Sequence, residues 1–279
     1  MSENEPTGKI DRLSSEPPAK PANPATAPEH YIEFLGVSKA FDGHVVLDNV
    51  SFHVERGQTA VIMGRSGAGK SVTLKHIMGF LEPDAGRVIV AGQDITGWQE
   101  YQLAAIRRRV TMVFQSGALF DSLTVGENIA FPLTETDLPQ EQIDARVTEL
   151  AQMLEVEDSL DRLPSDLSTG TKRAVAIARA LAQDPEAILY DEPTTMVDPL
   201  MAAHMGDLIL KLKQKFRKTS IVVTHDTHLA RKLADIVVFL QNGKISFFGP
   251  WKDFETSTDP FLHNFLEQDA LIPALDVTL

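Results

Sequence analysis

Cysteine is absent from this sequence of 279 residues. Disulfide bonds, thiolate zinc sites and cysteine nucleophiles are therefore excluded. No run of eighteen apolar residues occurs, so the chain is not expected to span a membrane. The first residues lack a basic segment followed by an apolar one, and five acids among the first thirty also argue against a secretory or transit peptide. We therefore expect a cytoplasmic protein.

Positive charge is also scarce, because 26 Lys and Arg stand against 39 Asp and Glu, a net charge of −13. A nucleic-acid-binding protein usually has the opposite balance, so no nucleic-acid partner is expected. The short basic runs at Arg107–Arg109 and Lys211–Lys218 are more typical of solvated helix faces. Hydrophobic residues make up 43% of the chain, enough for a full core, which excludes a disordered or fibrous protein.

The chain divides into three parts. Residues 1–30 hold 6 of the 16 prolines and no periodic pattern, which predicts a disordered Pro/Ala-rich tail. Between 31 and 250, short β-branched runs alternate with helical stretches, as in an α/β domain. No strand is evident between about 116 and 184, so an inserted helical subdomain is expected there. Residues 251–279 are expected to form a helical extension and an acidic tail.

The expected strands share β-branched or aromatic runs bounded by turn residues. They are Tyr31–Leu35, Val45–Val54, Thr59–Met63, Val88–Ala91, Val110–Phe114, Ala187–Tyr190, Ser220–Val223, Ile236–Leu240 and Lys244–Phe248. Between the last two runs, Asn242–Gly243 predicts a tight hairpin turn, because these residue types accept the positive φ angles that such a turn needs.

The segment Gly64–Ser71 fits the pattern G-x-x-x-x-G-K-[ST] and lies between an expected strand and the helical run Ser71–Phe80. Its glycines allow consecutive backbone N–H groups to surround phosphates at a helix N-terminus. We expect Lys70 to reach the β- and γ-phosphates of a nucleoside triphosphate and the Ser71 hydroxyl to bind Mg²⁺. The expected phosphate-binding residues are Gly64, Arg65, Ser66, Gly67, Ala68, Gly69, Lys70 and Ser71.

A second acidic element follows the apolar run Ala187–Tyr190. Asp191 and Glu192 come directly after this expected strand, at the edge of a parallel sheet where ligands bind. Asp191 is expected to hold Mg²⁺, and Glu192 to polarise an attacking water. Two acids after a strand are also common in surface loops, so the functional interpretation depends on the phosphate loop, Gly64–Ser71.

Together with four further elements, these two motifs resemble the nucleotide-binding subunit of ABC transporters over nearly all of 31–251. The further elements are Phe41, Gln115, the segment Leu167-Ser-Thr-Gly-Thr171 in place of the family signature, and Val223-Thr-His-Asp226; the second acidic element extends to Asp198. The resemblance implies an α/β P-loop NTPase fold, with a RecA-like core, an antiparallel β subdomain and an inserted helical subdomain.

The resemblance also implies roles within one chain. Phe41 would stack on adenine, for which an aromatic–base contact is worth roughly 1–3 kcal/mol. Gln115 would reach Mg²⁺ and the attacking water. His225 would hydrogen-bond the γ-phosphate and hold the water near Glu192.

Between chains, the resemblance implies a head-to-tail homodimer. ATP bound at Lys70 of one copy would be capped by Ser168 and Gly170 of the other, at the start of a helix whose N–H groups are free. Asp198 would face the phosphate loop of the other copy. Nucleotide binding would close the pair, hydrolysis would release it, and this motion would drive a membrane permease.

The signature departs from the family pattern at two positions. Thr169 replaces a glycine and Thr171 replaces the usual glutamine. A β-branched residue disfavours positive φ and crowds the backbone near the γ-phosphate, which predicts slower or altered hydrolysis. Because Glu192, Gln115 and His225 are all present, an active Mg²⁺-dependent ATPase is still expected; the alternative is a non-hydrolysing structural dimer.

A narrower resemblance concerns the cargo. The segments Gln115–Leu133 and Asp259–Leu266 resemble MlaF-type ATPases of MCE phospholipid transport systems. Gly117–Ala118, followed by two apolar residues, stand where many solute importers have a proline. This resemblance implies ATP-driven phospholipid transport between membranes of a bacterial envelope, with the chain peripheral on the cytoplasmic face of the inner membrane. It also implies an MlaE-like permease, an MCE-domain protein and a STAS-domain regulator as partners.

Two alternatives remain open. One is the ATPase subunit of a small-solute importer that works with a binding protein. The other is a soluble ABC ATPase acting outside transport, a class that usually joins two cassettes in one chain or inserts a long coiled coil.

Overall fold

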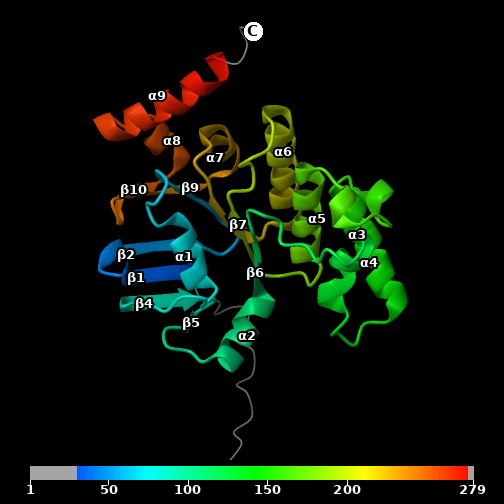
Figure 1. Ribbon diagram of the computed structural model, residues 1–279. Coiled ribbons are helices and arrows are strands. Elements are labelled where there is room, and N and C mark those ends of the chain that lie inside the picture. Colours follow the sequence, from blue (N-terminus) through cyan, green and yellow to red (C-terminus); the bar gives the residue numbers. More distant parts are fainter. Residues whose placement is uncertain (1–29, 276–279) are drawn as a thin grey trace, which may run out of the picture.

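The computed structural model describes residues 30–275, and from 268 onwards the path of the backbone alone. The expected disordered tail at 1–30 therefore lies outside the described residues, except for His30, and so does the end of the expected acidic tail. Figure 1 shows strands and helices in two groups, with α3, α4 and α5 to one side and α9 at the far end of the other.

Ten strands and nine α-helices make up the described structure. The strands are β1 (His30–Phe41), β2 (His44–Glu55), β3 (Thr59–Met63), β4 (Ala85–Val90), β5 (Gln93–Asp94), β6 (Val110–Val113), β7 (Ala187–Asp191), β8 (Thr219–Val223), β9 (Ile236–Gln241) and β10 (Lys244–Gly249). The α-helices are α1 (Lys70–Ile77), α2 (Glu100–Arg109), α3 (Val125–Ala130), α4 (Gln140–Met153), α5 (Thr169–Leu181), α6 (Pro199–Phe216), α7 (Thr227–Leu233), α8 (Trp251–Glu255) and α9 (Pro260–Leu275).

A six-stranded sheet in the order β10-β9-β3-β8-β7-β6 forms the centre of the molecule. The strands β9, β3, β8, β7 and β6 run parallel to one another, and only β10 is antiparallel to its neighbour. Along β3, Val61 and Met63 enter a core with α3–α9, whereas Ala60 and Ile62 enter a second core with β1, β2, β4 and α1. Both faces are thus covered, which explains why these strands are apolar throughout.

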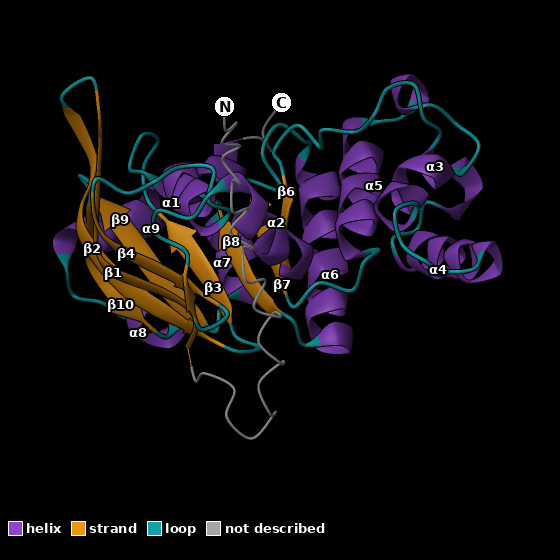
Figure 2. Cartoon of the chain, turned by 90° about the horizontal axis from the view of Figure 1, so that it is seen from below, coloured by secondary structure: helices purple, strands orange, loops and turns teal. Residues whose placement is uncertain are grey.

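A second, antiparallel sheet has the order β2-β1-β4-β5. Figure 2 shows the two sheets together on one side, with α3, α4 and α5 on the other. Two hairpins have the positive φ angles of tight turns. Asn242 (49°) and Gly243 (76°) confirm the predicted β9–β10 turn. Asp42 (48°) and Gly43 (81°) make a β1–β2 turn that was not predicted, so both strands are longer than expected.

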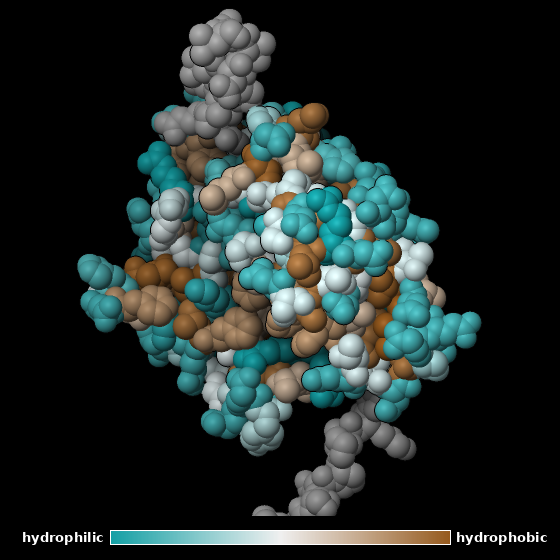
Figure 3. Space-filling view, turned by 45° about the vertical axis from the view of Figure 1, so that its right-hand side comes forward, coloured by the Kyte–Doolittle hydropathy of each residue, from teal (hydrophilic) through white to brown (hydrophobic). Residues whose placement is uncertain are grey.

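Between β6 and β7 the described chain contains helices and irregular segments. The side that carries α3, α4 and α5 exposes apolar side chains among polar ones (Figure 3).

Inside this part, Asn128 is fully buried at 0% exposure. Its side chain accepts from the backbone N–H of Phe120 and donates to the carbonyls of Phe120, Leu123 and Thr124. These bonds satisfy a buried amide and fix the loop that leads into α3. The boundaries 116 and 184 stay a prediction.

An ion-pair network lies at the end of the large sheet opposite the C-terminal ends of its parallel strands. Glu186 accepts from Arg109 at 2.6 Å and 3.2 Å and from Arg56 at 3.0 Å. Hydrogen bonds from Arg109 outweigh partial burial and lower the pKa of Glu186 from 4.5 to about 2.

We expect Glu186→Gln to lower the free energy of unfolding at pH 7 by about 1 kcal/mol, since these side chains are about one third exposed and solvent screens the pair. A depressed carboxyl pKa stabilises the fold above the unfolded-state value and loses this contribution as pH falls through the folded-state value. The difference in free energy of unfolding between the unaltered chain and Glu186→Gln should therefore shrink as the pH falls from 4.5 to about 2. Urea unfolding across this range measures it. A difference that stays constant would contradict the assignment.

Within the described residues, no helix combines the length and the apolar character needed to cross a membrane.

Candidate nucleotide-binding site

The expected site residues gather at the C-terminal ends of adjacent parallel strands. The phosphate loop follows β3, His225 follows β8, Asp191 ends β7 and Glu192 comes directly after it. Backbone bonds join these strand ends: the Glu192 N–H donates to Val223 at 2.9 Å, and the Thr224 N–H to Ile62 at 3.2 Å. The strand order β3-β8-β7 therefore brings three separate segments of the sequence to one edge of the sheet.

The phosphate loop has the backbone that its glycines predict. Gly67 and Gly69 have φ of 78° and 98°. Gly64 is the most constrained, since a Cβ there would lie 2.3 Å from the carbonyl oxygen of Leu240. Arg65, Ser66 and Gly67 are exposed, whereas Ala68, Gly69 and Lys70 are buried. The loop thus turns an open backbone surface towards solvent at the start of α1, the arrangement that suits an anion.

Lys70 is held inside the loop. Its ammonium group donates to the carbonyl oxygen of Gly64 at 2.9 Å and lies 3.5 Å from Glu192 Oε1. Its side chain is 9% exposed. A positive charge is therefore buried at the centre of the site, paired with the acid that the sequence analysis assigned to the attacking water.

The two acids after β7 have different partners. Asp191 accepts a hydrogen bond from the Ser71 hydroxyl at 2.9 Å, and burial raises the pKa of Asp191. Glu192 accepts from Thr195 and contacts the His225 ring, each at 2.9 Å. Burial of Glu192 opposes ionisation, but these hydrogen bonds, together with nearby positive charge, outweigh it and lower the pKa of Glu192.

Glu192 also has an unusual backbone. Its φ is 49°, a left-handed conformation that residues other than glycine rarely adopt and that is frequent at functional sites. The side chain is 13% exposed although the neighbouring His225 is 56% exposed. The structure thus fixes Glu192 between Lys70 on one side and His225 on the other.

Phe41 and Gln115 are both exposed. Phe41 ends β1, is 39% exposed, and has the Lys39 ammonium 5.6 Å from its ring centroid. Gln115 follows β6, at the far end of the strand order, and is exposed. In the described residues neither side chain is hydrogen-bonded to the phosphate loop, so their expected contacts with adenine and with Mg²⁺ stay predictions.

The signature segment, Leu167–Thr171, begins α5. Ser168 is the N-cap and accepts from the Thr171 N–H at 3.1 Å, and the two hydroxyl groups are 2.8 Å apart. Thr169 is the first helical residue and is not among the positive-φ residues. The expectation that a β-branched residue is strained there by positive φ is therefore wrong, because the segment is a helix N-terminus and not a left-handed turn.

Asp198 and Gly170 are brought together by a residue that the sequence analysis did not consider. Asp198 is the N-cap of α6 and accepts from the Met201 N–H at 2.9 Å. A Cβ on Gly170 would lie 2.5 Å from the Met201 side chain, so a larger residue there would force Met201 to move. Within the described residues no hydrogen bond joins Ser168, Gly170 or Asp198 to the phosphate loop of the same chain.

Arg173 is a further residue that the sequence reasoning missed. It is 3% exposed and donates to the backbone carbonyls of Pro193, at 2.7 Å, and of Thr195. A buried guanidinium on α5 thereby fixes the loop that follows Glu192. Its place after the signature, in a basic pair with Lys172, was the only sequence signal.

Replacing Arg173 with Ala is expected to lower the free energy of unfolding by about 2–4 kcal/mol, because two buried carbonyl oxygens lose a charged donor. Thermal and urea denaturation measure this loss. Lys172→Ala, at the partly exposed neighbour, should change stability little and serves as the control. Equal stability of the two variants would contradict the proposed support of the loop.

The C-terminal extension also reaches the phosphate loop, which the sequence did not indicate. Phe261 of α9 packs on Phe239 of β9, and the Arg65 guanidinium lies 5.2 Å from the Phe261 ring centroid. A cavity of about 300 Å³ opens between the loop, the β9–β10 turn and this helix. Phe261 of this extension is therefore packed beside the candidate site.

The site also offers ligands that fit Mg²⁺. The hydroxyl oxygen of Ser71 and the carboxylate of Asp191 are hard oxygen donors, the type that Mg²⁺ prefers, and they already lie 2.9 Å apart. The donor set at this edge is therefore compatible with the predicted metal.

Comparison with protein families gives one match. The model described as "ABC transporter" matches residues 47–195, which include the phosphate loop, the signature segment and the acids after β7.

Curated relatives agree with this match. The chain is 36% identical over 237 residues to the methionine import ATP-binding protein MetN of Brucella abortus (strain 2308), covering 85% of this chain and 64% of that protein. It is 34% identical to a probable ribonucleotide transport ATP-binding protein, mkl, of Mycobacterium leprae (strain TN), covering 84% and 68%. It is 33% identical to the Fe(3+) ions import ATP-binding protein FbpC of Escherichia coli (strain K12), covering 88% and 70%. The chain thus spans about two thirds of the length of these relatives.

Solved structures show the same fold. One is a dimeric post-hydrolysis state of the ATP-binding cassette MJ0796 bound to ADP and Pi, with 32% identity, a TM-score of 0.72, and coverage of 78% of this chain and 98% of that one. Another, cbiO1 from Clostridium perfringens, has a TM-score of 0.76 and covers 90% and 96%; at 24% identity it supports the fold alone.

Proposed function

Because the chain belongs to the ABC transporter family, whose ATP-binding proteins are ATPases, we propose that it binds and hydrolyses ATP to power a transporter. The observation that carries this proposal is the placement of Glu192 between Lys70 and His225, at the sheet edge where the phosphate loop opens. The P-loop NTPase fold and the motif order support it.

Phosphate binding follows from the loop. The backbone N–H groups of 64–70 and the N-terminus of α1 attract the negative charge of the β- and γ-phosphates. Lys70 then exchanges its contacts with Gly64 and Glu192 for phosphate oxygens, which are stronger acceptors when charged. Phe41, exposed at the end of β1, is the proposed contact for the base.

Hydrolysis needs a group that orients water. Glu192 is ionised near neutral pH because its pKa is lowered, so its carboxylate accepts a hydrogen bond from the attacking water and draws its proton. His225 and Thr195 hold the carboxylate in place and restrict its rotation. Mg²⁺ held by Ser71 and Asp191, with Gln115 as a third candidate ligand, would neutralise phosphate charge when bound.

We also propose a head-to-tail homodimer. Ser168 and Asp198 are exposed and do not contact the phosphate loop of their own chain. Beside Asp198, the apolar side chains of Met196 and Leu200 are 83% and 82% exposed. An apolar surface next to the exposed N-terminus of α5 suits a second copy, whose bound γ-phosphate this N-terminus would cap.

A membrane permease is the second proposed partner. Phe120 and Phe131 are 42% and 43% exposed, although their ring centroids lie 4.4 Å apart, and the Arg179 guanidinium lies 5.5 Å from Phe120. This aromatic pair follows Gln115 in the sequence and gives the helical side of the chain an apolar contact surface. Docking there would hold the chain on the cytoplasmic face of the membrane.

For the cargo, the relatives favour small-solute import, since their names refer to methionine and Fe(3+) import. The MlaF-type resemblance of Gln115–Leu133 supports the other candidate, phospholipid transport with an MlaE-like permease, an MCE-domain protein and a STAS-domain protein. No relative described above carries that function in its name, so phospholipid transport stays a prediction made from this segment.

The experiment that tests the function is a pull-down of the tagged chain from its native membranes in mild detergent, with mass spectrometry of the captured proteins. A permease with a solute-binding protein would support small-solute import. A permease with an MCE-domain protein would support phospholipid transport instead. Recovery of soluble partners alone would overturn the transporter assignment, and a purified chain without ATP turnover would overturn the ATPase.

A further inference from the structure

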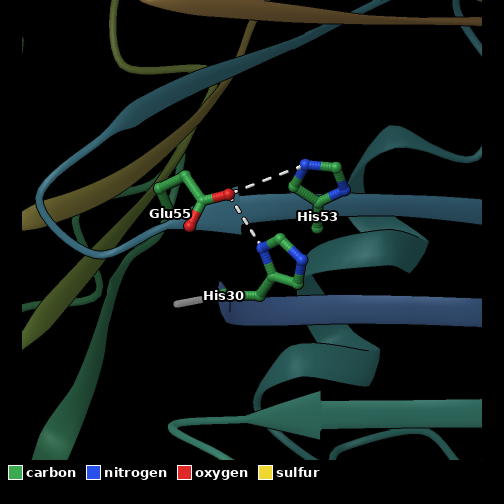
Figure 4. Close-up of side chains that lie close together, drawn as sticks. All are labelled: His30, His53 and Glu55. Carbon is green, nitrogen blue, oxygen red and sulfur yellow. Dashed lines mark hydrogen bonds and ion pairs between the residues drawn. The ribbon is translucent and has the colours of Figure 1, made fainter. Parts of the chain in front are cut away.

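Three potential metal ligands meet on the antiparallel sheet, away from the nucleotide site. His30 begins β1, and His53 and Glu55 lie near the end of β2 (Figure 4). Glu55 Oε1 lies 2.8 Å from His30 Nδ1 and 3.7 Å from His53 Nε2. Within the described residues this is the one group of three such side chains whose ligand atoms converge, all within 4.8 Å.

A bulge in β1 explains why His30 joins the other two. His53 and Glu55 are two residues apart on β2, so they share a face. On β1, His30 is paired with Glu55 and Ile32 with Val54, so two steps along β1 match one step along β2. Tyr31 and Ile32 are consecutively buried at 0% exposure, as the bulge requires. The extra residue returns His30 to the outer face, opposite Glu55.

The spacing suits a tetrahedral ion. Ligands bound at 2.0–2.2 Å in tetrahedral geometry lie about 3.3–3.5 Å apart, between the two Glu55 distances. The side chains are 34–40% exposed, so an ion can enter, and a water can complete its coordination. Glu33 is directly opposite His53 on the neighbouring strand and adds negative charge.

The surroundings hold the ligands without competing for them. The ring of Phe248 packs edge-on against His53, with centroids 5.2 Å apart, and restricts its orientation. Arg56, the cation next to Glu55 in the sequence, pairs with Glu186 at 3.0 Å and lies over the Tyr31 ring. Arg56 therefore does not compete with the two imidazoles for the carboxylate of Glu55.

We propose that His30, His53 and Glu55 bind one Zn²⁺ ion per chain. Two neutral imidazoles and one carboxylate form a donor set that zinc accepts readily, with an open position for water. The ion would join the start of β1 to the end of β2 and stabilise the antiparallel sheet. His30 and Phe41 are at opposite ends of β1, so this site is separate from the proposed nucleotide contact of Phe41.

The test is isothermal titration calorimetry of the full chain with ZnCl₂, with Mg²⁺ in excess to occupy oxygen ligands elsewhere. We expect one saturable site per chain and a rise in the melting temperature on zinc addition. His53→Ala and the nearly isosteric Glu55→Gln should each weaken the affinity at least about tenfold, since loss of an outer-shell partner alone costs 10–100-fold. Should His53→Ala fail to fold by circular dichroism, Glu55→Gln decides.

The matched control is His263→Ala. His263 lies 3.1 Å from Glu267 on α9, an exposed pair for which the described side chains offer no third ligand. Its loss should leave the zinc affinity unchanged. A titration without a saturable site, or equal affinity in His53→Ala, Glu55→Gln and the unaltered chain, would overturn the proposal and leave an ordinary histidine–glutamate ion pair. ATP turnover is measured in parallel, so a failure of the proposed function is distinguished from a failure of this site.

Discussion

Replacing Glu192 with Gln is expected to lower ATP turnover at least about a hundredfold while ATP binding is retained, because positioned general bases contribute roughly 10²–10⁴-fold. The amide keeps the size of the side chain but cannot accept a proton from water. It also removes the negative charge 3.5 Å from Lys70, which frees that ammonium for phosphate. The variant should therefore accumulate as an ATP-bound dimer.

Two measurements check this expectation: phosphate release for turnover, and light scattering after gel filtration with and without ATP for the dimer. Glu155→Gln is the control, since Glu155 is an exposed acid paired with Lys211 at 3.0 Å, outside the site. Turnover equal to that of the unaltered chain would remove Glu192 as the group that orients water. Loss of turnover without a trapped dimer would contradict the head-to-tail arrangement instead.

The site was predictable where one short segment fixes its own conformation. Gly64–Ser71 contains the residues that make its turn and the helix start that follows it, so neither depends on distant contacts. Asn242–Gly243 is a similar case, because two residues with positive φ define the hairpin. Asp191 and Glu192 were predictable from the apolar strand before them, which ends at the ligand-binding edge.

Tertiary contacts decided what the sequence did not show. Arg173 was not identified from the sequence, because its burial depends on the packing of α5 against the loop at 193–195. The two-residue strand β5 depends on pairing with β4 and has no pattern of its own. The approach of Phe261 to Arg65 depends on how the C-terminal helix docks on β9.

The expectation of strain in the signature segment was wrong for a different reason. Reading Thr169 as strained assumed that every glycine of a family pattern marks positive φ, although glycine also serves where two backbones approach closely. Thr169 is helical, and the position where a Cβ would displace a neighbour is the next one, where Gly170 meets Met201. The threonine is therefore compatible with the helix, and its effect on turnover depends on the second copy.

Replacing Lys70 with Ala is expected to weaken ATP binding at least about thirtyfold, since loss of one partner of a buried charged pair costs roughly 2–5 kcal/mol. The substitution removes the cation that balances the phosphates. It also leaves the Glu192 carboxylate beside them without the Lys70 ammonium, so the loss exceeds that of one hydrogen bond. Calorimetric titration with ATP and Mg²⁺ measures the affinity.

The control variant Lys75→Ala distinguishes the effect of the position of Lys70 on ATP affinity from the effect of the total charge of α1. Lys75 lies on the same helix, α1, but is exposed. The Lys75→Ala variant loses the same formal charge a little over one turn away from Lys70, so this variant should bind ATP nearly as well as the unaltered chain. Normal affinity in Lys70→Ala would refute the phosphate site. Equal weakening in both variants would mean that the field of α1, and not a buried ammonium inside the loop, attracts the nucleotide.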